Sequence, residues 1–198
     1  MIINHARRWV IITPPKTGST TLRTLLVDES AGRDTCCFTG HQHDATLPRD
    51  CQSYGVFATV RNPYDRAVSL WWHRLWDIRH EQGTVGAGCS GPSVAALACE
   101  HPFSEFVGWM ATAEAFFAWP CTRWLRFVPA YRVLRLESLG ADLRRWRLLP
   151  TGRPIPHENR TGHGPVHAYY TPEIRDVIRA SHRDDFEAFG YSDELPRP

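Results

Sequence analysis

The sequence predicts a single α/β domain, residues 1–198, with a small central parallel sheet flanked by helices. Three observations lead to this prediction. A β-branched run at 9–13 is followed by a tight loop and a helical pattern, which is how an α/β unit begins. Two further strand candidates, at 54–60 and 131–136, are also each followed by a helical pattern. The length of 198 residues fits one domain with a substantial core.

The first predicted unit consists of the strand 9–13, a loop that contains two prolines, and a helix that begins near Gly18 or Ser19. The strand is short, apolar and rich in β-branched residues, as expected of a buried strand. The helix is indicated by leucines at positions i, i+3 and i+4, namely Leu22, Leu25 and Leu26. The polar and turn-rich stretch that follows, 30–53, predicts no regular element.

The second unit starts with the strand 54–60 and continues into a long amphipathic helix over 63–80. Apolar residues recur there at helical spacing, namely Val68, Trp71, Trp72, Leu75 and Trp76. We expect these tryptophans to be core residues rather than a platform for a base or sugar. Residues 83–92 are rich in glycine and predict a flexible loop. Two shorter helices are expected at 93–100 and 103–118.

The third unit is the strand 131–136 with a helix over 137–147. A long loop rich in Pro, Gly and His follows at 150–168, and loops of that length are usually functional or disordered. A last helix is predicted from Pro172 to Gly190, because Thr171 is a good N-cap and proline is favoured in the first turn.

Composition and charge exclude several classes of protein. The hydrophobic share of 42% and charged share of 22% exclude wholesale disorder, and a net charge of +2 does not favour nucleic-acid binding. The sequence contains no 18-residue apolar stretch, and the run 9–12 is too short for a secretory signal. We therefore expect a soluble, cytoplasmic protein with no membrane insertion and no nucleic-acid partner. The six cysteines form no C-x-x-C pair, so we expect reduced, mostly buried thiols.

The loop of the first unit contains Lys16, the single lysine in a chain with 22 arginines. A strand-to-helix loop presents backbone N–H groups and the positive end of the helix dipole, which together favour an anion. Lys16 adds a mobile positive charge suited to a phosphate or sulfate oxygen. Because Lys16 precedes Gly18, the only glycine of the loop, the segment is not a Walker A motif. The alternative interpretation is an ordinary exposed turn.

A second candidate segment, 60–70, begins at the end of the strand 54–60. Arg61 leaves that strand, and Ser69 lies about two helical turns further on. In an open α/β sheet, ligands bind beyond the carboxyl ends of the strands, where Lys16 and Arg61 are both expected. Two such anion-binding ends predict a ligand with two separated phosphate groups. The alternative for Arg61 is a helix-start ion pair with Asp65.

Residues 15–21, Pro-Lys-Thr-Gly-Ser-Thr-Thr, resemble the 5′-phosphosulfate loop of sulfotransferases that use 3′-phosphoadenosine 5′-phosphosulfate (PAPS). Residues 60–69, Val-Arg-Asn-Pro-Tyr-Asp-Arg-Ala-Val-Ser, look like the 3′-phosphate motif of that family. Residues 131–139 are similar to its later core strand. Residues 170–191 resemble the closing helix of heparan 2-O-sulfotransferase-like carbohydrate sulfotransferases. The resemblance implies a P-loop-like sulfotransferase fold and transfer of a sulfuryl group from PAPS, the co-substrate, to a hydroxyl of a carbohydrate or small molecule.

The resemblance also implies roles for individual residues, with no metal required. The 5′-phosphosulfate would be held by the first loop and the start of its helix, namely Lys16, Thr17, Gly18, Ser19, Thr20 and Thr21. The 3′-phosphate would be held by Arg61 and Ser69. The long loop 150–168 would close over the nucleotide, with Asn159, Arg160 and Thr161 as candidates to contact phosphate or adenosine; the alternative is a solvated loop. Apart from the resemblance, the helical segment 81–127 is a candidate to shape an acceptor cleft, with Trp109, Trp119 and Trp124 as the candidate side chains.

The transfer to a hydroxyl needs a general base, and His41 and His43 are the candidates. They lie between the two nucleotide motifs, where related carbohydrate sulfotransferases carry their base, and Asp44 is close enough in sequence to orient either imidazole. We prefer His41 narrowly. The alternative is a pair of surface loop histidines or an adventitious metal site.

Two other functions compete with a sulfotransferase. A P-loop nucleotide or small-molecule kinase shares the strand–loop–helix arrangement, but the sequence lacks its G-K-[ST] signature and an evident magnesium-binding carboxylate after a strand. A non-catalytic module that binds a nucleotide or a sulfated ligand needs the same anion site without the chemistry.

Overall fold

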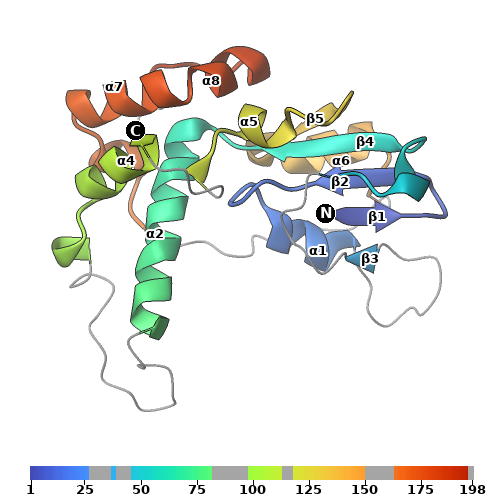
Figure 1. The fold of residues 1–198 in the computed structure, drawn as a ribbon, viewed down its shortest axis with the longest axis horizontal. Coiled ribbons are helices and arrows are strands. Elements are labelled where there is room, and N and C mark those ends of the chain that lie inside the picture. Colours follow the sequence, from blue (N-terminus) through green and yellow to red (C-terminus); the bar gives the residue numbers. More distant parts are fainter. Residues whose placement is uncertain (27–36, 39–45, 82–97, 113–117, 150–162, 196–198) are drawn as a thin grey trace. The chain divides into compact units, whose positions relative to one another are not determined.

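The computed structural model describes residues 1–26, 37–38, 46–81, 98–112, 118–149 and 163–195 (Figure 1). Contacts within the chain divide it into two compact units. The first unit consists of Met1–Asn62 with Pro120–Arg160, and the second consists of Pro63–Trp119 with Thr161–Pro198. Both units contain helices, and the sheet belongs to the first, so the chain has the predicted α/β class.

The first unit contains a five-stranded sheet with the order β3-β1-β2-β4-β5. Its central strands β2 (Trp9–Ile12), β4 (Gly55–Val60) and β5 (Arg132–Arg135) are parallel to one another, which confirms the three predicted strands. The predicted small central parallel sheet is present as part of a larger, mixed sheet. Two short strands that the sequence analysis missed, β1 (Ile2–Asn4) and β3 (Cys37–Phe38), add antiparallel pairs at one edge.

Helices α1 (Ser19–Leu26) and α6 (Leu139–Arg145) contribute to one hydrophobic cluster of the first unit. The predicted helix over 137–147 is shorter than expected, because a 3-10 turn, η3 (Leu136–Ser138), precedes α6. The strand side chains in this cluster come from positions that share one face of the sheet, namely Ile2, Trp9, Ile11, Phe57 and Leu134. Intervening residues are also buried, namely Val10, Ile12, Ala58 and Val60. Burial on both faces explains the continuous apolar runs.

The second unit packs α2 (Pro63–Glu81), α4 (Phe103–Thr112) and α7 (Pro172–Ser181) against one another. Its core is rich in aromatic side chains, including Tyr64, Trp71, Phe103, Phe106 and Phe186. Trp71 is 4% exposed and lies in this core, as the helical spacing predicted. Partly buried residues of η4 (Val166–Tyr169), within the predicted loop 150–168, pack on the same core.

The predicted C-terminal helix is interrupted at His182 and forms two helices, α7 and α8 (Arg183–Phe189). Thr171 caps α7, with its hydroxyl accepting the Ile174 N–H, and α8 ends at Gly190 with a φ of +63°, as the sequence predicted for the two outer ends. The break could not be predicted, because histidine has no strong effect on helix formation. In the structure His182 is 2% exposed.

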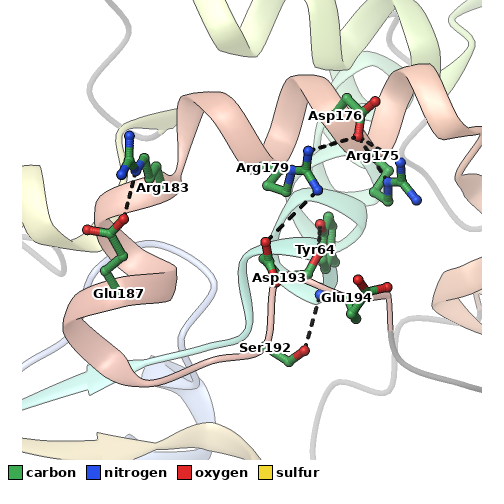
Figure 2. A network of polar contacts seen from close by, with 9 residues as sticks. All are labelled: Tyr64, Arg175, Asp176, Arg179, Arg183, Glu187, Ser192, Asp193 and Glu194. Carbon is green, nitrogen blue, oxygen red and sulfur yellow. Dashed lines mark hydrogen bonds and ion pairs between the residues drawn. The ribbon is translucent and has the colours of Figure 1, made fainter.

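A network of polar contacts joins the first turn of α2 to the segment after α8 (Figure 2). The Tyr64 hydroxyl donates to the Asp193 carbonyl at 2.6 Å, and Arg179 lies 4.0 Å from the Asp193 carboxylate. Burial, and then the charge of Asp193, raise the pKa of Tyr64 to about 12. A surface groove borders these residues, but its Arg179 and Arg183 already face carboxylates, so we assign it no ligand.

Candidate functional site

The carboxyl ends of the three parallel strands meet at one edge of the sheet. Ile12, the last residue of β2, pairs with Ala58, and Val60, the last residue of β4, pairs with Arg135, the last residue of β5. The loop with Lys16 therefore leaves the same edge as Arg61, which directly follows β4. This is the arrangement that the sequence predicted for the two motifs, and the edge is where open α/β sheets bind ligands.

The Lys16 loop turns sharply between β2 and α1. Lys16 has a φ of +64° and Gly18 a φ of +96°, so two residues of the short loop adopt a conformation that L side chains rarely take. The Thr17 N–H donates to the Pro14 carbonyl at 3.3 Å, and the first helical hydrogen bond runs from the Leu22 N–H to the Gly18 carbonyl at 3.0 Å. The backbone N–H groups that precede Leu22 lie at the start of α1, where N–H groups have no intrahelical acceptor.

The hydroxyl of Thr17 points into the first unit rather than toward a ligand. It donates to the Pro14 carbonyl at 2.7 Å and lies 2.6 Å from the hydroxyl of Thr59 in β4. The Thr59 hydroxyl also lies 3.5 Å from the Ile12 carbonyl, so the two hydroxyls and the two carbonyls form one buried network. Both threonines are fully buried. Thr17 therefore fixes the loop to the neighbouring strand, and its hydroxyl does not serve the anion as the resemblance implied.

Gly18 packs closely against the residue that follows β5. A Cβ atom built at Gly18 would lie 2.6 Å from Cδ1 of Leu136, well inside normal contact distance. The close approach and the positive φ both favour glycine at this position. The loop is thus held from two sides, by Thr59 of β4 and by Leu136 beyond β5.

A carboxylate that the sequence analysis did not single out lies at the same edge. Glu137, two residues after β5, accepts the Asn62 N–H at 2.7 Å through Oε1. This contact fixes the backbone beside Arg61, where β4 ends. Glu137 is also exposed, so an exposed carboxylate follows one of the three parallel strands.

The remaining predicted site residues have different outcomes. Lys16 is half-buried, and the residues of the first turn of α1 border the loop, namely Ser19, Thr20 and Thr21. Ser69 belongs to the second unit and is 2% exposed in α2, so it offers a phosphate little surface in this structure. Five predicted site residues lie outside the described residues, namely His41, His43, Asn159, Arg160 and Thr161.

The tryptophans proposed to shape an acceptor cleft also differ among themselves. Trp124 is 8% exposed and lies in α5 (Cys121–Leu125) of the first unit, so it is a core residue there. Trp109, on α4 of the second unit, is 42% exposed. Trp119 is half-buried. Of the three tryptophans, Trp109 is therefore the most exposed to solvent.

No protein-family model, curated protein or solved structure matches this chain. None of the helices in the described part of the chain combines the length and the apolar character that a membrane span requires. The interpretation of the site therefore rests on its residues and on the geometry of the strand ends.

Proposed function

We propose that the chain is a PAPS-dependent sulfotransferase with a P-loop-like fold, acting on a hydroxyl of a carbohydrate or other small molecule. The observation that supports this most strongly is the edge of the first unit at which the Lys16 loop and Arg61 follow neighbouring parallel strands. One cation beside a helix N-terminus and a second cation at the next strand suit a nucleotide with separated 5′ and 3′ anionic groups.

In this proposal Lys16 and the amides at the start of α1 bind the 5′-phosphosulfate. The acceptor oxygen forms a bond to sulfur while the bond from sulfur to the 5′-phosphate oxygen breaks, and 3′-phosphoadenosine 5′-phosphate leaves. Lys16 stabilises the negative charge that develops on the leaving oxygen, and either His41 or His43 accepts the acceptor's proton. As in phosphoryl transfer, the protein mainly positions the reactants and stabilises charge.

The rigid support of the loop suits this role. Thr17, Thr59 and Leu136 fix the backbone on either side of Lys16, so the amides of α1 keep one orientation. Preorganised donors stabilise a transition state without reorganisation during the reaction. The flexible ammonium of Lys16 then supplies the mobile part of the site.

A kinase is the second candidate, and the position of Glu137 is the observation that favours it. A carboxylate at the carboxyl edge of a parallel sheet can hold Mg²⁺ beside a nucleoside triphosphate. Against a kinase stands the loop itself, since Lys16 precedes Gly18 and the G-K-[ST] signature is missing. Dependence on Mg²⁺ separates the two functions.

An acceptor screen with labelled PAPS tests the proposal. We expect transfer to at least one hydroxyl compound, and we expect Lys16→Arg to bind nucleotide yet transfer poorly, because the planar guanidinium differs from the ammonium in shape and reach. Arg23→Lys, on the exposed side of α1, is the matched control and should transfer normally. Normal transfer by Lys16→Arg would remove the proposed role of the lysine. Nucleotide binding without transfer to any acceptor would support a binding module.

A further inference from the structure

A group of side chains with metal-binding chemistry lies near the amino ends of β2 and β4, away from the candidate functional site at their carboxyl ends. The ligand atoms of His5, Asp50 and Cys51 all lie within 4.8 Å of one another. His5 follows β1 and precedes β2, while Asp50 and Cys51 belong to the 3-10 helix η1 (Arg49–Cys51) that precedes β4. We propose that these three side chains bind one divalent metal ion of the borderline-soft type, best represented by Zn²⁺.

The backbone holds the two segments of this cluster in a fixed relation. Trp9, the first residue of β2, pairs with Gly55, the first residue of β4, so the chain segments before both strands start from the same edge. The Gly55 N–H donates to the Arg8 carbonyl at 2.9 Å, which joins the β1–β2 turn to the segment after η1. The side chain of Arg8 also donates to the Ser53 hydroxyl at 2.8 Å.

Each segment is fixed internally as well. In the turn, Asn4 accepts the Arg7 N–H through Oδ1 at 2.8 Å, and around η1 the Cys51 N–H donates to the Pro48 carbonyl at 3.0 Å. The Tyr54 N–H then donates to the Cys51 carbonyl at 3.0 Å. These hydrogen bonds hold the backbone around the three ligand residues before any metal binds.

Tyr54 provides the kind of contact that orients a metal-binding histidine. Its hydroxyl lies 3.2 Å from Nδ1 of His5, and the two rings meet edge to face with their centroids 5.9 Å apart. When the hydroxyl accepts the Nδ1 proton, Nε2 keeps its lone pair for a metal. Metal-bound histidines commonly donate their other ring N–H to such a partner.

The donor set suits zinc better than magnesium or calcium. One imidazole nitrogen, one carboxylate oxygen and one thiolate sulfur are all zinc ligands, whereas the hard cations prefer oxygen. In a tetrahedral zinc site neighbouring ligand atoms are about 3.3–3.6 Å apart, given the usual metal–ligand distances. Because His5 and Asp50 are exposed, small rotations of their side chains can close the remaining distance.

The burial pattern also fits a surface metal site. Cys51 is fully buried, so its sulfur would form the floor of the site, with the exposed His5 and Asp50 at the rim. On binding, the Cys51 thiol releases its proton to solvent, and the thiolate and carboxylate together balance the charge of a divalent ion. Three protein ligands leave a fourth position for water.

This metal site is independent of the proposed sulfotransferase function. It lies at the amino ends of β2 and β4, whereas Lys16 and Arg61 follow their carboxyl ends. A bound ion would join the β1–β2 turn to η1 and so stabilise the antiparallel pair of β1 and β2 against unfolding. Its test therefore uses binding and unfolding rather than sulfate transfer.

Titration of the tag-free, reduced full chain with Co²⁺, followed by competition with Zn²⁺, tests the proposal. We expect one Co²⁺ per chain, a thiolate-to-cobalt charge-transfer absorption in the near ultraviolet, and displacement by Zn²⁺. His5→Gln and Asp50→Asn should each weaken Zn²⁺ binding about tenfold or more, since even outer-shell changes at metal sites cost that much. Both side chains are exposed, so the fold should tolerate these variants.

Matched controls come from residues of the same types elsewhere. His101→Gln and Cys99→Ser, both at exposed positions, should leave the affinity and the absorption unchanged, whereas Cys51→Ser should abolish the absorption. Circular dichroism shows whether the Cys51 variant folds. If it does not, the Zn²⁺ affinities of the His5 and Asp50 variants test the proposal. Unchanged Zn²⁺ affinity in both of those variants, or a cobalt complex without the thiolate absorption, would overturn the proposal.

Discussion

Replacing Gly18 by alanine tests the structure of the Lys16 loop. The φ of +96° places this residue where an L side chain is strained, and such strain costs about 1–3 kcal/mol. The added Cβ would also approach Cδ1 of Leu136 to 2.6 Å. That atom is the end of a flexible side chain, so it can move away at the expense of packing. We therefore expect Gly18→Ala to lower the free energy of unfolding by about 1–3 kcal/mol.

Urea-induced unfolding followed by tryptophan fluorescence measures this loss. Gly108→Ala is the matched control, because Gly108 lies in α4 and nothing lies within 4 Å of its added Cβ. There alanine should leave the stability unchanged or raise it by up to about 1 kcal/mol, since it favours helix more than glycine does. In a folded Gly18→Ala protein, nucleotide binding should weaken as well. A Gly18→Ala protein as stable as the wild type would refute the loop conformation described above.

Two further predictions concern buried polar side chains. Thr17→Val removes the hydroxyl that lies 2.6 Å from the Thr59 hydroxyl inside the first unit and should lower the free energy of unfolding in urea by about 1–3 kcal/mol, whereas Thr20→Val at an exposed position should lower it much less. Equal losses would contradict the assigned pair. Burial, and then the nearby Arg66, lower the pKa of His182 from its ordinary value of 6.5 to about 3. Between pH 6.5 and about pH 3, His182 is therefore protonated in the unfolded chain but neutral in the folded chain. The free energy of unfolding is therefore unaffected by this histidine above pH 6.5 and falls as the pH is lowered, by roughly 2 kcal/mol at pH 5. His182→Gln should remove this part of the pH dependence, and an unchanged slope would contradict the assignment.

The central strands could be predicted because their signals are local. The runs at 9–13 and 54–60 are largely apolar on both faces and are bounded by turn residues, which is typical of buried parallel strands. The run at 131–136 contains two arginines but is short, contains apolar residues and is followed by a helical pattern. The edge strands were missed for the opposite reason. β1 has three residues and β3 has two, too few to show a period, and each forms by pairing with a strand already present.

The candidate site was predictable to the same extent. Lys16 and Arg61 each follow a strand, and the parallel order brings their segments to one edge. The hydrogen bonds that hold the backbone at that edge could not be predicted, because they join residues that are far apart in the sequence. Thr17 and Thr59 are 42 positions apart, and Asn62 and Glu137 are 75 positions apart, so no local pattern could pair them.

Calorimetry with 3′-phosphoadenosine 5′-phosphate in the absence of Mg²⁺ tests the central claim most directly. The proposal predicts saturable binding at one site, weakened by Lys16→Ala and by Arg61→Ala and unaffected by Arg23→Lys, because the two cations at neighbouring strand ends each hold an anionic group. No binding of this nucleotide, together with tight binding of Mg·ATP, would contradict the sulfotransferase proposal and support the kinase.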